Sequence, residues 1–214
     1  MIAFRLALRN LVRDLKSGEI AVLLLALLVA VASLTAVGFF TSRVARAVNQ
    51  QAGEVLAADL RLESARAIDE AYDREAPNRG LRVARVLSMP SVVLLGEDSS
   101  LITLRAASEG YPLRGRLKVA DRPFGPARVV EGIPARGEAW ADSRLLARLG
   151  AAVGSELSVG AARFRVTQVL DYRPDQGAGF ADRSSTLLIN MADMPATELV
   201  QPGSRVSRAV LFAG

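Results

Sequence analysis

The 214-residue sequence contains neither cysteine nor histidine. Without cysteine a disulfide framework is impossible, so cysteine usage says nothing about the redox compartment. Histidine is the commonest metal ligand and the only side chain that titrates near neutrality unaided. Zinc sites and nucleophiles of the Ser-His-Asp or Cys-His kind are therefore excluded. Carboxylate pairs, lysine-activated serines and oxygen-ligand metal sites are the chemistry that remains.

Lysine is also scarce, since only Lys16 and Lys118 occur among the 27 basic residues. The net charge is +5. Four of the 27 basic and two of the 22 acidic residues precede Ile20, so 23 basic residues face 20 acidic ones from Thr41 onward. A nucleic-acid binder gathers its basic residues in a patch or stripe. No such run is present, and no nucleic-acid partner is expected.

The stretch from Ile20 to Phe40 has no charged residue in 21 positions. A helix of that length covers about 31 Å, close to the roughly 30 Å hydrocarbon core of a bilayer. The hydroxyls of Ser33 and Thr35 can bond back to helix carbonyls. A buried helix of a soluble protein usually shows a polar face, and this stretch shows none. The sequence therefore predicts a transmembrane helix.

A cleaved signal peptide is the main rival, because Ala45-Arg46-Ala47 resembles a small-x-small cleavage site. The apolar stretch is longer than the roughly 7–15 residues of a signal sequence, and 19 residues precede it. An uncleaved anchor is therefore favoured. Four cations precede the span, and only Arg43 and Arg46 follow it closely. The positive-inside rule then predicts a cytoplasmic N-terminus and a main domain on the far side.

Residues 3–17 show the periodicity of an amphipathic helix, with apolar residues on one face and cations on another. Such a helix lies at the membrane interface, with its cations near anionic lipid. The predicted interface residues are Phe4, Arg5, Leu8, Arg9, Leu11, Val12, Arg13, Leu15 and Lys16. The alternative is a cationic flank that only sets topology.

Beyond Phe40 the helical rhythm continues to Ala57-Ala58, which predicts a stalk able to pass movement between the span and a folded domain. Three segments are expected: an interfacial helix (1–18), a transmembrane helix with stalk (19–58) and an α+β domain (59–214). Strand patterns alternate there with short helical patterns, as in α+β folds.

The expected strands of the domain are Asp59–Ser64, Leu81–Leu87, Ser91–Leu95, Leu101–Ala107, Glu138–Ala141, Glu156–Val159, Arg163–Val169, Thr186–Asn190 and Val206–Phe212. The expected helices are Ala67–Ala76, Ser143–Leu149 and a short turn or helix at Ala192–Thr197. Asp142 and Gly150 are the expected caps of the second helix, and Gly160 the turn of a hairpin. The segment Gly110–Gly137 is expected to be mostly irregular surface, and Asp171–Ala181 is expected to be a loop.

Motifs for catalysis are missing. No GxxxxGK[ST] phosphate loop is present, and Gly177-Ala178-Gly179 lacks the third glycine of a dinucleotide loop. The carboxylates of Asp69, Glu70 and Asp73 fit a solvated helix face better than a catalytic pair. Ser184-Ser185 has no lysine nearby in the sequence. We therefore expect no catalytic residue, no cofactor and no metal, and a protein that is not an enzyme.

One loop carries more than turn residues. The run Tyr172-Arg173-Pro174-Asp175-Gln176-Gly177-Ala178-Gly179-Phe180 places two aromatics on a glycine-rich segment between strands. An exposed aromatic in such a loop can contact a partner. Tyr172 and Phe180 are therefore possible partner contacts, and the alternative is that both rings pack under the loop.

Several runs resemble the FtsX-like, MacB-type permeases of ABC transporters. Leu6-Ala7-Leu8-Arg9-Asn10-Leu11 resembles the opening A-x-R-N-L elbow of that family. Trp140 to Gly150, Val153 to Leu157 and Arg163 to Val166 are similar to its "l-a-x-x-l-g-x-x-v-G-d-x-i" passage and the "f-x-V" that follows. Resemblance to YbbP-type permeases lies in four runs, Gln50-Gln51, Gly177–Phe180, Ile189–Asp193 and Val200–Val206. Of these, Val200–Val206 is the most specific.

The resemblance implies a MacB-like periplasmic core domain on a bacterial inner-membrane permease. It implies a separate cytoplasmic ATPase as partner, with ATP-driven periplasmic work or movement of hydrophobic or lipid-like compounds. It also suggests a periplasmic partner of the thioesterase/lysophospholipase type.

The sequence ends at Gly214, before the further spans and the coupling helix of that family. A fragment of a longer permease, or one product of a split gene, is therefore expected. The alternatives are a self-contained, single-pass sensor or binding module without a transport role and, more remotely, an anchored hydrolase.

Overall fold

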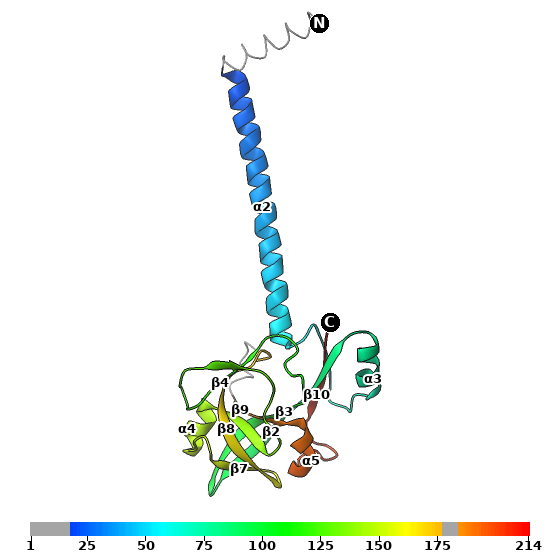
Figure 1. Ribbon diagram of the computed structural model, residues 1–214, viewed down its shortest axis with the longest axis vertical. Helices are drawn as coiled ribbons and strands as arrows, with labels where there is room; N and C mark the ends of the chain where they lie inside the picture. The colour runs from blue at the N-terminus through cyan, green and yellow to red at the C-terminus, as the bar shows by residue number, and fades with distance from the viewer. Residues whose placement is uncertain (1–17, 177–183) are drawn as a thin grey trace, which may run out of the picture. The chain divides into compact units, whose positions relative to one another are not determined.

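The computed structural model describes residues 18–176 and 184–214, without the side chains of residues 19, 20 and 45–54 (Figure 1). Contacts within the chain divide it into two units, Met1–Gln50 and Gln51–Gly214. Both helices and strands are present, and the expected α+β class is confirmed.

Helix α2 runs from Glu19 to Leu56 without a break. Its 38 residues make a rod of about 57 Å at 1.5 Å per residue. The prediction that the helix continues beyond Phe40 is confirmed. The helix ends because Ala57 adopts a left-handed conformation with φ 56°, as residues that follow a helix often do.

The folded unit after α2 contains ten described strands and three described α-helices. The strands are β1 (Leu60–Ser64), β2 (Arg82–Leu95), β3 (Asp98–Ala107), β4 (Leu117–Ala120), β5 (Arg128–Val130), β6 (Glu138–Asp142), β7 (Glu156–Val159), β8 (Ala162–Tyr172), β9 (Ser185–Asn190) and β10 (Ser207–Ala213). The helices are α3 (Ala71–Asn78), α4 (Ser143–Leu149) and α5 (Met194–Thr197), with a 3-10 turn η2 (Met191–Asp193) before α5.

The strands form one mixed sheet in the order β1-β10-β2-β3-β9-β6-β8-β4-β5. Strand β7 pairs with both β2 and β8, so that β2, β3, β9, β6, β8 and β7 close into a ring. One apolar cluster takes residues from all six strands of this ring and from α4, including Val93, Ile102 and Phe164. A second cluster lies on the opposite face and includes Tyr111 and Trp140. Strand β9 lies between the two clusters, which explains why most of its residues are buried.

The predicted caps of α4 and the predicted turn of the β7–β8 hairpin are confirmed. Asp142 has extended backbone angles, and its Oδ1 accepts a hydrogen bond from Leu145 N at 2.6 Å, as an N-cap does. Gly150 ends the helix at φ 61°. The β7–β8 hairpin turns at Gly160, whose φ is 58°.

Two expected strands are in fact one. The segments Leu81–Leu87 and Ser91–Leu95 belong to the single strand β2, which continues through Pro90. On the side of β2 shared by β10 and β7, pairing stops at Ser88 and resumes at Val93. A proline is tolerated in a strand where no neighbour needs its N–H. The sequence alone does not reveal that gap in the pairing.

The expectations for Gly110–Gly137 and for the first helix are corrected. The first segment contains β4 and β5, because Leu117 and Val119 alternate with polar residues and pack in the second cluster. Helix α3 begins four residues later than expected, at Ala71. Asp69 Oδ1 accepts a hydrogen bond from Ala71 N at 2.8 Å, and this turn competes with helix formation before Ala71. The expected loop at residue 171 also starts late, since β8 runs to Tyr172.

Candidate functional site

The apolar part of α2, Ala21–Val44, has a mean hydropathy of 2.7, and none of it is buried. It is the one helix among the described residues that is long and apolar enough to cross a bilayer. Thr35 Oγ1 donates to Val31 O at 2.7 Å, so this hydroxyl is satisfied within the helix as expected. A core helix of a soluble protein would bury at least one apolar face. Full exposure of an apolar rod therefore fits contact with lipid.

Most of the predicted contact residues lie outside the described residues. These are the interface residues Phe4, Arg5, Leu8, Arg9, Leu11, Val12, Arg13, Leu15 and Lys16, and also Phe180 of the loop. Tyr172 is described, and it is half-buried at the end of β8. Lys118 Nζ lies 5.5 Å from the centroid of the Tyr172 ring, at cation–π distance. A partner contact at Tyr172 remains a prediction.

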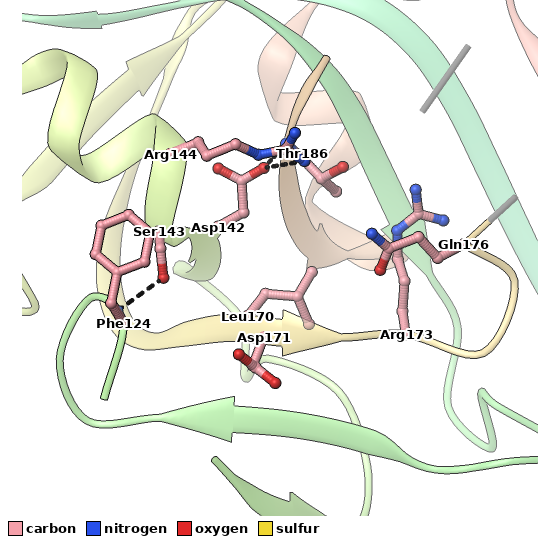
Figure 2. A pocket seen from close by; sticks show the side chains of 9 residues that line it. All are labelled: Phe124, Asp142, Ser143, Arg144, Leu170, Asp171, Arg173, Gln176 and Thr186. Atoms are coloured by element: carbon pink, nitrogen blue, oxygen red, sulfur yellow. Dashed lines mark hydrogen bonds and ion pairs between the residues drawn. The ribbon is translucent and has the colours of Figure 1, made fainter. Parts of the chain in front are cut away.

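A cavity of about 230 Å³ lies between β6, α4, β9 and the end of β8 (Figure 2). Seven of its nine lining residues have polar or charged side chains. The lining residues are Phe124, Asp142, Ser143, Arg144, Leu170, Asp171, Arg173, Gln176 and Thr186.

The carboxylate of Asp142 has a structural role in this cavity. Its Oδ1 caps α4, and its Oδ2 accepts a hydrogen bond from Thr186 N at 2.8 Å, which ties α4 to β9 (Figure 2). Arg144 Nη2 lies 3.9 Å from the same Oδ2. Because both oxygens already bind backbone N–H groups, Asp142 is poorly suited to act as a general acid or base.

Phe124, on the rim of this cavity, combines high exposure with backbone strain. Its side chain is 75% exposed, and its φ is 55°, in the left-handed region that phenylalanine seldom adopts. Its N–H donates to Ser143 Oγ at 3.1 Å, and this bond holds the strained turn against α4 (Figure 2). Strained residues gather at functional sites. Phe124 therefore joins Tyr172 as a candidate contact residue, and nothing in the sequence pattern indicated it.

The segment after β8 is anchored by a group of five residues, named here the Asp175 cluster: Asp175, Arg61, Arg105, Arg173 and Tyr111. Tyr111 Oη donates to Asp175 Oδ1 at 2.6 Å, and Arg173 Nη1 lies 3.1 Å from that oxygen. Arg61 Nη1 lies 3.4 Å from Asp175 Oδ2, which Arg105 Nη2 also contacts. The cluster joins β1, β3, the chain after β3 and the segment after β8 through one carboxylate.

Burial controls the electrostatics of this cluster. The side chains of Asp175 and Arg105 are 1% and 7% exposed. Burial lowers the pKa of Arg105 to about 10, so its guanidinium remains charged at neutral pH. Burial also raises the pKa of Tyr111, which stays a neutral hydrogen-bond donor. Three cations therefore hold one carboxylate in a region with little water, where removing the carboxylate is costly.

The Asp175 cluster was not predicted from the sequence, although the position of Arg105 in the sequence is unusual. Arg105 interrupts the apolar strand pattern of Leu101–Ala107, and a charged residue within a core strand calls for a partner. Asp175 stands 70 positions away in a glycine-rich segment, without periodicity to connect the two.

The sequence of this chain matches a known protein family. Residues 20–211 match the model of the MacB-like periplasmic core domain. The chain is 32% identical over 202 residues to the protein described as uncharacterized ABC transporter permease YbbP of Escherichia coli (strain K12). That match covers 94% of this chain and 24% of the relative, so the chain spans about a quarter of the length of the curated relative.

Two solved structures are similar to this chain at a lower sequence identity than the curated relative. The extracellular domain of the noncanonic ABC-type transporter YknZ from Gram-positive bacteria is 15% identical, with 60% of this chain and 63% of that chain covered and a TM-score of 0.41. The periplasmic region of MacB from Actinobacillus actinomycetemcomitans is 17% identical, with 66% and 64% covered and a TM-score of 0.41.

The family model covers most of the chain, and it begins inside α2 and ends inside β10. The resemblance found in the sequence is thereby confirmed. ABC transporter permeases are membrane components of transporters and not a class of enzymes. With an N-terminal apolar helix and a periplasmic-type domain, the chain belongs to the ABC transporter permease family that carries the MacB-like periplasmic core domain.

Proposed function

We propose that this chain is the first span and periplasmic domain of a permease that couples ATP hydrolysis by a separate ATPase to periplasmic work, or to movement of hydrophobic or lipid-like compounds. The observation that carries the proposal is the exposed apolar helix Ala21–Val44 within a chain that matches the MacB-like domain over residues 20–211. The sequence contains no GxxxxGK[ST] motif, so these 214 residues do not hydrolyse ATP through a P-loop. Catalysis by the chain itself is not part of the proposal.

The proposed arrangement keeps the expected segments: an interfacial helix at 1–18, a span with stalk at 19–58, and a periplasmic domain at 59–214 of the bacterial inner membrane. The continuous helix Glu19–Leu56 supports a stalk, because a helix without a break resists bending better than a linker does. The lipid bilayer and a cytoplasmic ATPase are the proposed partners. A thioesterase/lysophospholipase-type protein is a further proposed partner, with Tyr172, Phe124 and Phe180 as possible contacts.

Pull-down of the full-length permease tests the coupling. We expect a nucleotide-binding ATPase subunit to copurify from membranes, and the ATPase activity of the complex to fall when residues 59–214 are deleted. Failure to recover any ATPase subunit under conditions that keep the permease folded contradicts the proposal. Unchanged ATPase activity after the deletion contradicts the mechanical role of the domain.

The absence of cysteine makes orientation testable in the 214-residue chain. Ser17→Cys and Ser99→Cys each introduce one thiol, on opposite sides of the apolar helix in the sequence. In intact cells a maleimide that cannot cross the inner membrane should label Ser99→Cys, and it should label Ser17→Cys only after lysis. The reverse pattern would place the N-terminus outside. Labelling of both in intact cells would show that the helix does not span.

A further inference from the structure

A groove lies between helix α3 and strand β1, apart from the cavity described above. Its volume is about 450 Å³, within the range of about 300–1,000 Å³ that is typical of small-molecule sites. Most of its lining residues are apolar or aromatic, namely Leu60, Leu62, Tyr72, Ala76, Leu81 and Phe212. The groove therefore offers a ligand mainly hydrocarbon surface.

The register of the sheet explains why this groove is open. In the β1–β10 ladder Leu60 lies opposite Phe212 and Leu62 lies opposite Val210, and residues directly opposite each other project from the same face. Helix α3 covers this face over β10, because Val210 and Phe212 are buried with Ala76 of α3 in a third, smaller apolar cluster. Strand β1 is the outermost strand at this end of the sheet. The helix does not cover β1 to the same extent, so a groove remains beside Leu60.

Two large side chains of the groove remain exposed to water. Leu60 is 61% exposed on β1, and Tyr72 is 47% exposed on α3. The centroid of the Tyr72 ring lies 6.4 Å from that of the buried Phe212 ring, so the two rings form one continuous aromatic wall. Removal of apolar surface from water is the dominant favourable term in association, so a ligand that covers both exposed side chains gains affinity.

The charged side chains of the groove already have partners. Arg79 Nε lies 2.8 Å from Glu75 Oε1, and both residues line the groove. Arg61 Nε lies 3.0 Å from Glu63 Oε2, and Arg61 Nη1 lies 3.4 Å from Asp175 Oδ2. All three charged residues that line the groove are thus in ion pairs within the protein. Its charge pattern therefore favours an uncharged ligand over an anion or a cation.

We propose that this groove binds an alkyl chain, which lies against Phe212 and between Leu60 and Tyr72 and leaves any polar head group in water. The proposed transport function does not assign the binding of a compound to the folded domain, so this inference goes beyond it. Binding in the groove needs no ATPase. A negative result would therefore leave the proposed coupling to an ATPase standing, and loss of that coupling would leave the groove unaffected.

Protection of a single thiol tests the site, because the sequence contains no cysteine. Leu60→Cys places one thiol on the wall of the groove in the 214-residue chain, which is held in nanodiscs. Leu101→Cys is the matched control, since Leu101 is 63% exposed on β3 and does not line the groove. The rate of labelling by a water-soluble maleimide is measured with butan-1-ol, hexan-1-ol and octan-1-ol as probes, each at a known free concentration in the aqueous phase.

Occupancy of the groove should slow the labelling of Leu60→Cys. At a free alkanol concentration about ten times the one that halves the rate, labelling should be roughly tenfold slower, because the thiol reacts only in the empty groove. The concentration that halves the rate should fall about fourfold for each added CH₂ group. Labelling of Leu101→Cys should change by less than about twofold under the same conditions.

Tyr72→Cys repeats the test from the α3 side of the groove, so that the outcome does not depend on one variant. Its thiol should be protected over the same range of alkanol concentrations as that of Leu60→Cys. Unchanged labelling of both groove variants with octan-1-ol overturns the proposal. Equal slowing in Leu101→Cys, or a half-maximal concentration that does not fall with chain length, overturns it as well.

Discussion

Asp175→Asn preserves the size of a buried side chain and removes the charge that three arginines contact. Arg105 and Arg173, whose side chains are 7% and 4% exposed, then lose their shared carboxylate in a region with little water. Removing one partner of a buried ion pair typically costs about 3–5 kcal/mol of folding free energy. For a unit of this size each kcal/mol corresponds to a shift of about 2–4 °C, so we expect the unfolding midpoint to fall by roughly 6–20 °C.

The single tryptophan of the chain provides the assay. Trp140 is 6% exposed in the second apolar cluster, so its emission should shift to longer wavelength when the domain unfolds. Asp171→Asn is the control, because it makes the same chemical change four positions earlier at an exposed side chain. A midpoint for Asp175→Asn within about 2 °C of that control would refute a role for the cluster in stability.

Three further results are expected. Gly160→Ala should lower the free energy of unfolding by about 1–3 kcal/mol more than Gly150→Ala does. The two glycines have similar φ angles of 58° and 61°, but only at Gly160 would an added Cβ meet a backbone atom, Thr197 O at 2.0 Å. Equal thermal unfolding midpoints for the two variants would contradict the clash. Phe124→Gly should raise the free energy of unfolding by about 1 kcal/mol, because glycine adopts a φ of 55° without strain. Phe124→Ala should not raise it, and denaturant titration of both variants measures the difference. The pKa of Glu63 is held below its ordinary value of 4.5, first by the hydrogen bond from Ser207, so its contribution to stability is complete above about pH 4.5 and is lost as the pH falls through the lower, folded-state pKa. As the pH falls from 5 to the acid limit of folding, the free energy of unfolding should therefore decrease less in Glu63→Gln than in the parent chain. Parallel plots of unfolding free energy against pH for the two proteins would contradict this.

The structural predictions made from the sequence are correct where residues close in sequence determine the structure. The apolar run, the caps Asp142 and Gly150 and the turn at Gly160 depend on bonds within a few positions, and all were predicted. The break expected at Pro90 was wrong, because its outcome depends on which strand lies beside β2. The strained turn at Phe124 could not be predicted either, since Ser143, which holds it, is 19 positions away.

The sequence by itself determined the membrane-anchored α+β plan and the limits on chemistry. Hydropathy and missing residue types are properties of the chain that no folding changes. Only the tertiary structure decided where charges and cavities meet. It closed six strands into a ring through β7 and brought Arg61, Arg105 and Tyr111 to Asp175. These are long-range contacts, and the free energy that stabilises them comes from burial and electrostatics in the assembled fold, to which local sequence patterns give no direct access.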